Sequence, residues 1–161
     1  MDEAVAMLRE AADQGHMEAQ ANCGALYSCG KGVAKDDRLA FVYSEKAARQ
    51  GLGWAQRNTG VFYEDGQGCE QSYERAAEWY KKAVRQGDAF AQNALGLLYT
   101  DGKGVTQSHE RAFELFKQSA AQGDPRPLEL PSKAASVSRS APPPHSTKSK
   151  LCSGLSVSKV L

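Results

Sequence analysis

The sequence predicts an all-α protein: an α-solenoid of helix–turn–helix repeats with a 36-residue period, followed by a disordered C-terminal tail. Three kinds of element recur at that spacing, and they are single glycines, Ala-Gln pairs and Gly-x-Gly elements. They are Gly15, Gly51, Gly87 and Gly123; Ala19-Gln20, Ala55-Gln56 and Ala91-Gln92; and Gly30-Lys31-Gly32, Gly66-Gln67-Gly68 and Gly102-Lys103-Gly104. Self-similarity at one fixed period of this length is the signature of stacked repeats, each of them one supersecondary unit.

The first helix of each unit is expected at residues 17–28, 53–64 and 89–100. Small and apolar residues have helical spacing there, and in the third copy Ala91, Leu95, Leu98 and Tyr99 fall on one stripe. Asp88 precedes this copy as a candidate N-cap. The Gly-x-Gly element ends each helix, because glycine enters left-handed conformations without a Cβ penalty.

The second helix of each unit is expected at residues 36–49, 72–85 and 108–121. Asp36, Ser72 and Ser108 open these helices as candidate caps. The inner face of the second copy is predicted to be Ala76, Trp79, Tyr80 and Ala83. Glycine at residues 51, 87 and 123 then follows as the residue after the C-cap.

A further glycine lies inside each first helix, at Gly24, Gly60 and Gly96. Glycine in a helix interior costs about 1 kcal/mol relative to alanine, so its recurrence at the same position of every repeat requires a reason. We expect close backbone contact there, between this glycine and the alanines of the paired second helix.

The repeat phase divides the chain into an orphan second helix at residues 1–15, three full units at 16–51, 52–87 and 88–123, and a tail at 124–161. The orphan helix is either an N-terminal cap or the end of a longer array, and its ordinary apolar stripe favours the longer array. The tail holds all six prolines, nine serines, and six basic against two acidic residues. This composition predicts disorder.

Composition argues against several functional classes. The formal net charge is +1, and no segment has the roughly 20 apolar residues that span a bilayer, so we expect neither nucleic-acid binding nor membrane insertion. The three histidines have no partners at catalytic or metal-ligand spacing. The glycine elements lack a following Lys-Ser/Thr and follow helices, which disfavours a phosphate cradle. No cofactor, metal, catalytic residue or small-molecule substrate is predicted.

Two segments resemble the Sel1-like repeat family, whose members are relatives of the tetratricopeptide repeats. Residues 91–105 look like the family signature, and residues 76–83 match its second helix. The resemblance covers residues 2–123. It departs where Ala34, Glu70 and Thr106 replace a common proline, and where Cys69 replaces a valine.

The resemblance implies an adaptor whose first helices line a concave groove for a protein partner, either an extended peptide or a helix. By analogy with tetratricopeptide repeats, groove positions lie three before, one after and four after the inner glycine. In the first unit these are Ala21, Ala25 and Ser28. In the second and third units they are the predicted partner-binding residues, Arg57, Val61, Glu64, Asn93, Leu97 and Thr100.

The cysteines are predicted to be reduced thiols. Cys23 and Cys69 lie at repeat positions where other units have leucine or valine, whereas Cys29 falls at a loop position expected to be exposed. Some secreted members of the resembled family carry one disulfide per unit, and this chain has no such regular pair. We therefore expect an intracellular, cytoplasmic location. A targeting segment upstream remains open if the chain is part of a longer array.

These observations favour a non-enzymatic adaptor or scaffold that binds a partner in the groove. The alternatives are a thiol-dependent or hydrolytic enzyme centred on Cys29, and a regulatory fragment of a larger signalling protein.

Overall fold

The computed structural model describes residues 3–123, and this part of the chain consists of helices without strands, which confirms the predicted all-α class. The helices are α1 (Glu3–Asp13), α2 (Met17–Cys29), α3 (Asp37–Arg49), α4 (Gly53–Asp65), α5 (Tyr73–Arg85), α6 (Ala89–Asp101) and α7 (His109–Ala121). The predicted disorder of residues 124–161 lies outside the described residues.

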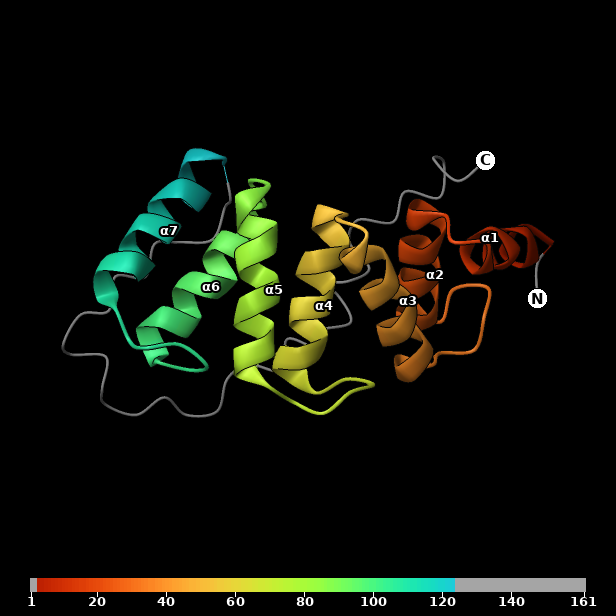
Figure 1. Cartoon of the computed structure of the whole chain (residues 1–161), viewed down its shortest axis with the longest axis horizontal. Helices are drawn as coiled ribbons and strands as arrows, with labels where there is room; N and C mark the ends of the chain where they lie inside the picture. The colour runs from red at the N-terminus through yellow and green to blue at the C-terminus, as the bar shows by residue number, and fades with distance from the viewer. Residues whose placement is uncertain (1–2, 124–161) are drawn as a thin grey trace.

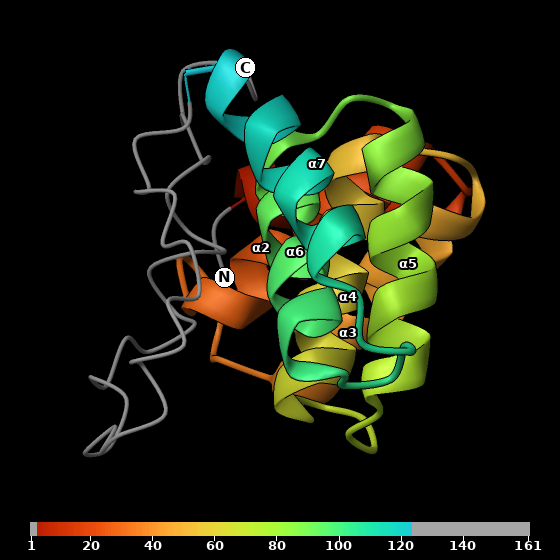
Figure 2. The same cartoon turned by 90° about the vertical axis from the view of Figure 1, so that its left-hand side faces the viewer.

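The helices are stacked in chain order. Each packs against the next one along the sequence, and Figure 1 shows them side by side from α1 to α7. Seen along the stack in Figure 2, α6 and α7 lie in front of the earlier helices. The packing is closest within three pairs, α2–α3, α4–α5 and α6–α7, and α1 packs against α2 ahead of them.

The predicted caps are present. The side chains of Asp36 and Asp88 accept hydrogen bonds from the backbone N–H groups of Leu39 and Ala91, at 2.9 and 2.8 Å. Ser72 and Ser108 accept equivalent bonds at 3.3 and 3.4 Å. Each bond satisfies a donor that has no partner within its own helix.

One continuous core runs the length of the stack, from Ala12 to Phe116. Alanines fill the narrow spaces between helices, and Ala40, Ala76 and Ala112 occupy one fully buried address. Neither helix of a pair buries its apolar stripe alone, so the stack is needed to close the core.

The inner glycines of the second and third units have a different nearest neighbour from the predicted one. A Cβ on Gly60 would lie 2.5 Å from the ring of Tyr80, and one on Gly96 would lie 2.7 Å from the ring of Phe116. At Gly24 a Cβ would meet the Ser44 hydroxyl and second-helix backbone, at 3.1 Å from the carbonyl oxygen of Ala40. In the second and third units the glycine therefore makes room for an aromatic ring rather than for an alanine face.

The second glycine of the Gly-x-Gly element joins neighbouring units. Gly68 has φ +69°, and a Cβ there would lie 2.0 Å from the carbonyl oxygen of Asp37, at the start of the preceding second helix. Gly104 stands equally close to the backbone of Tyr73. The loop of each of these units thus rests on the preceding unit, with no space for a side chain.

The Ala-Gln pairs also join units. The Gln56 side chain donates to the carbonyl of Ala48 at 3.3 Å and accepts a bond from Gln86 at 2.9 Å. Gln20 makes the same two bonds, donating to Ala12 at 3.1 Å and accepting from Gln50 at 2.7 Å. The carbonyls of Ala12 and Ala48 also accept backbone hydrogen bonds from Gly15 and Gly51, so each buried glutamine side chain adds a bond that ties its helix to the end of the preceding one.

Apolar side chains at both ends of the stack are exposed, whereas the side chains at the equivalent repeat positions in its middle are buried. Met7 of α1 is 67% exposed, against 6% for Tyr43 at the same address. At the other end, Leu97 and Phe113 are 52% and 47% exposed, against 4% for Val61 and 1% for Ala77. A following unit covers the addresses of Val61 and Ala77, and no described unit follows α7.

Candidate protein-binding surface

The predicted groove positions differ widely in exposure. In the first unit Ala21, Ala25 and Ser28 are buried. In the later units Val61 and Asn93 are also buried, Arg57, Glu64 and Thr100 are half-buried, and Leu97 is exposed. Side chains that a partner can reach directly are therefore those of Arg57, Glu64, Leu97 and Thr100, on α4 and α6. Whether these residues bind a partner stays a prediction.

Arg57 is held by the following unit. Its guanidinium Nη1 lies 3.3 Å from the carboxylate Oδ2 of Asp88, and the group stands 5.6 Å from the ring centroid of Phe90. The carboxylate of Asp88 also caps α6, so it is fixed by backbone as well. The ion pair and the ring together orient the arginine while leaving part of it open to solvent.

Glu64 is held by its own unit. The hydroxyl of Tyr80, a fully buried residue of α5, donates a hydrogen bond of 2.5 Å to the Glu64 carboxylate. The ring of Tyr80 also lies against Gly60. Because glycine has no side chain, it leaves the space that the ring needs to reach Glu64. A charged acceptor roughly doubles the strength of such a bond, which fixes the carboxylate in one position.

Burial raises the pKa of Tyr80 well above its ordinary value, and the adjacent Glu64 carboxylate adds to the shift. Burial also raises the pKa of Tyr43 to about 12, assisted by its hydrogen bond to Asp13. These hydroxyls stay protonated in the folded protein but ionise near pH 10 in the unfolded chain. Their contribution to the free energy of unfolding is therefore fully present below pH 10 and decreases as the pH rises above it.

We therefore expect the free energy of unfolding to decrease from about pH 10 upward, with a shallower decrease in Tyr80→Phe. At pH 7 the same variant should lose about 1 kcal/mol, the usual net contribution of a hydrogen bond. Urea unfolding at pH 7, 9, 10 and 11 measures both effects. Equal pH slopes for the wild type and Tyr80→Phe would contradict the burial of this hydroxyl.

Two functional neighbours were not predicted from the sequence. Phe90 and Asp88 position Arg57, and Trp54 shares the address of Phe90 in the preceding unit. The sequence contained an indication of the aromatic neighbour, because Trp54 and Phe90 both lie one helical turn before a predicted groove residue.

The cysteines differ from expectation at one position. Cys23 is buried, which raises the pKa of its thiol to about 11, and burial also raises the pKa of Cys69. Thiols with raised pKa values are weak nucleophiles at neutral pH. Cys29 ends α2 and is half-buried, so the prediction of an exposed loop position is wrong there.

Within residues 3–123 we find no group of three or more His, Cys, Asp or Glu residues that could hold a metal ion. In the same part of the chain, no helix combines the length and apolar character needed to cross a bilayer.

Stacked helix pairs with side chains presented by successive first helices define an α-solenoid repeat protein. A family model of the Sel1 repeat matches residues 1–16, 18–52, 55–88 and 89–124, so the chain belongs to the Sel1 repeat family. Proteins of this family are in general scaffolds for protein–protein interaction. A comparison with curated protein sequences gives no match.

Solved structures show the same fold. A protective antigen of uropathogenic Escherichia coli with an SLR fold is 36% identical, with a TM-score of 0.71 over 73% of this chain and 25% of its own. A Sel1 repeat protein from Oxalobacter formigenes is also 36% identical, with a TM-score of 0.66 over 69% and 46%. Helicobacter pylori cysteine rich protein B is 26% identical, with a TM-score of 0.57 over 73% and 90%. The chain thus spans a quarter to a half of the first two structures.

Proposed function

We propose that the chain is a non-enzymatic adaptor that binds a peptide or helix of a partner protein along the exposed side of α4 and α6. The observation that carries this proposal is a set of charged groups that are already oriented. Asp88 and Phe90 hold Arg57, and Tyr80 holds Glu64, before any partner arrives. Side chains fixed in advance lose little conformational entropy on binding, so their contacts contribute more to affinity.

Leu97 supplies the apolar part of the surface. It is more than half exposed on α6, one turn from Thr100, whose hydroxyl donates to the carbonyl of Gly96 at 3.0 Å. An exposed aliphatic side chain with polar groups around it suits a segment that contributes one apolar anchor and several hydrogen bonds.

Quantitative affinity purification tests the proposal with three variants of the whole chain. Leu97→Lys and Arg57→Glu alter the proposed surface, whereas Arg85→Glu changes an exposed charge at the end of α5 and serves as the matched control. We expect both surface variants to lose specific partners at least tenfold, on the order of the effect of one interface anchor, and the control to keep them.

Melting temperatures decide whether a loss reflects binding or folding. Leu97→Lys should melt like the wild type, because its side chain is exposed. A folded Leu97→Lys variant that retains every partner would contradict the proposed surface.

A further inference from the structure

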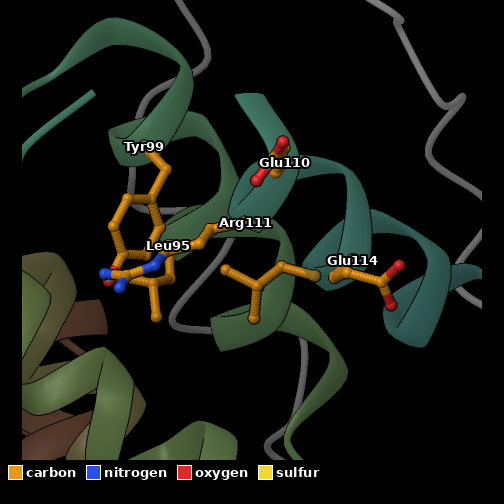
Figure 3. A pocket seen from close by; sticks show the side chains of 6 residues that line it. Leu95, Tyr99, Glu110, Arg111 and Glu114 are labelled. Carbon is orange, nitrogen blue, oxygen red and sulfur yellow. Dashed lines mark hydrogen bonds between the residues drawn. The ribbon is translucent and has the colours of Figure 1, made fainter. Parts of the chain in front are cut away.

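A recess lies on another side of the third unit, between α6 and α7. It has a volume of about 450 Å³, and its lining residues are Leu95, Tyr99, Glu110, Arg111, Glu114 and Leu115. Figure 3 shows the tyrosine and leucine on α6, with the charged side chains on α7. Because two residues correspond to about 200° around a helix, Leu95 and Tyr99 face away from Leu97. The recess is therefore separate from the proposed partner surface.

The first unit shows an aromatic ring at the corresponding place. Leu115 occupies the address of Tyr43 in the first unit and of Trp79 in the second. In the first unit the Tyr43 ring is stacked on Tyr27, at the address of Tyr99, with centroids 5.9 Å apart and planes inclined by 1°. Leucine has no ring, so the third unit lacks the aromatic side chain that both earlier units supply. The recess beside Leu115 is therefore bounded by side chains, Tyr99 and Leu95, that can contact an aromatic ring.

The rim of the recess carries unbalanced negative charge. The Arg111 guanidinium stands over the Tyr99 ring at 5.6 Å, with Nη1 3.5 Å from the tyrosine hydroxyl oxygen, so it forms part of the wall. Glu110 and Glu114 are exposed, one helical turn apart, and on the far side of the recess from Tyr99 in Figure 3. Among the described residues neither carboxylate has an ion-pair partner within 4 Å.

We propose that this recess binds one aromatic side chain of a partner protein, from a segment with a basic residue adjacent to the aromatic one. The ring would take the place that Tyr43 fills in the first unit, against Tyr99 and Leu95. The basic neighbour would pair with Glu110 and Glu114. Residues 124–161 contain no Phe, Tyr or Trp, so this chain's own C-terminal segment cannot supply the ring.

Two peptides and one filled-in variant test the proposal. The probes are acetyl-Ala-Arg-Trp-Arg-Ala-amide and the same peptide with alanine in place of tryptophan, titrated into ¹⁵N-labelled protein. We expect the tryptophan peptide to shift the amide resonances of residues 95, 99, 111 and 115 saturably. The dissociation constant should be on the order of 1 mM, as one partly buried ring supports, and the alanine peptide should bind at least tenfold more weakly.

Leu115→Trp restores the residue of the second unit and should weaken the binding of the tryptophan peptide at least tenfold while preserving the spectrum elsewhere. Leu115→Tyr, the residue of the first unit, is the second variant if tryptophan does not fit. Glu110→Gln combined with Glu114→Gln should weaken binding severalfold at low salt and less at high salt. Leu97→Lys should have no effect, which separates this site from the proposed adaptor surface.

Three results would overturn the proposal. They are equal binding of the two peptides, unchanged binding by a folded Leu115→Trp or Leu115→Tyr variant, and absence of saturable shifts at millimolar peptide. Self-association of the protein that Leu115→Trp abolishes would instead assign the recess to a second copy of the chain.

Discussion

Replacing Gly68 by alanine is expected to destabilise the protein by about 3 kcal/mol or more, a large share of a typical domain's stability. Two causes act together. The left-handed backbone at φ +69° costs a residue with a Cβ about 1–2 kcal/mol, and the new methyl group would overlap the carbonyl oxygen of Asp37, at 2.0 Å. Because that atom belongs to the backbone, the loop must move away from the preceding unit. Urea unfolding followed by circular dichroism measures the loss.

Gly87→Ala is the matched control. This glycine also has a left-handed conformation, at φ +81°, but no atom lies within 4 Å of the position of its Cβ. Its substitution should therefore cost only the conformational part, about 1–2 kcal/mol. Equal losses for the two variants would show that contact between the loop and the preceding unit is unimportant.

Gly96→Leu should destabilise the third unit by about 2–4 kcal/mol, despite the higher helix propensity of leucine. A Cβ at this position would lie 2.7 Å from the Phe116 ring, and the larger side chain would separate α6 from α7. The melting temperature should fall by several degrees, as expected for a domain of this size.

Phe116→Ala provides the control for this second substitution. Removing the ring leaves space beside Gly96, so the two changes should be less harmful together than the sum of their separate effects, as for residues in direct contact. An unchanged melting temperature for Gly96→Leu, or strict additivity with Phe116→Ala, would refute the contact.

Most of the fold could be predicted because its determinants are local. Asp36 and Gly51 define one second helix by cap chemistry alone, and the 36-residue period then transfers those limits to every unit. The partner of the inner glycine could not be predicted in this way. Alanines and aromatic residues both lie on the inner face of the second helix, and only the packing of the helix pair decides that Tyr80 and Phe116 are nearest to Gly60 and Gly96.

The candidate surface was less predictable, because exposure depends on neighbouring units. Val61 and Leu97 share one address in the repeat, yet one is buried and the other exposed. A repeat pattern assigns both the same position and contains no information on what the next unit covers. Likewise, Arg57 gains its orientation from Asp88 and Phe90 across a unit boundary, and a contact of this kind has no signature within one repeat.

The uneven exposure of Met7, Leu97 and Phe113 implies that protection of backbone amides from hydrogen exchange varies along the array. A unit in a linear stack is stabilised by its own helix pair and by each neighbour, and terminal helices have a neighbour on one side only. Amides of α4 and α5 should therefore exchange by the rarest opening events, whereas α1 and α7 exchange through partial openings that leave the centre folded. Among the described helices, α1 and α7 should accordingly open before α4 and α5 on heating.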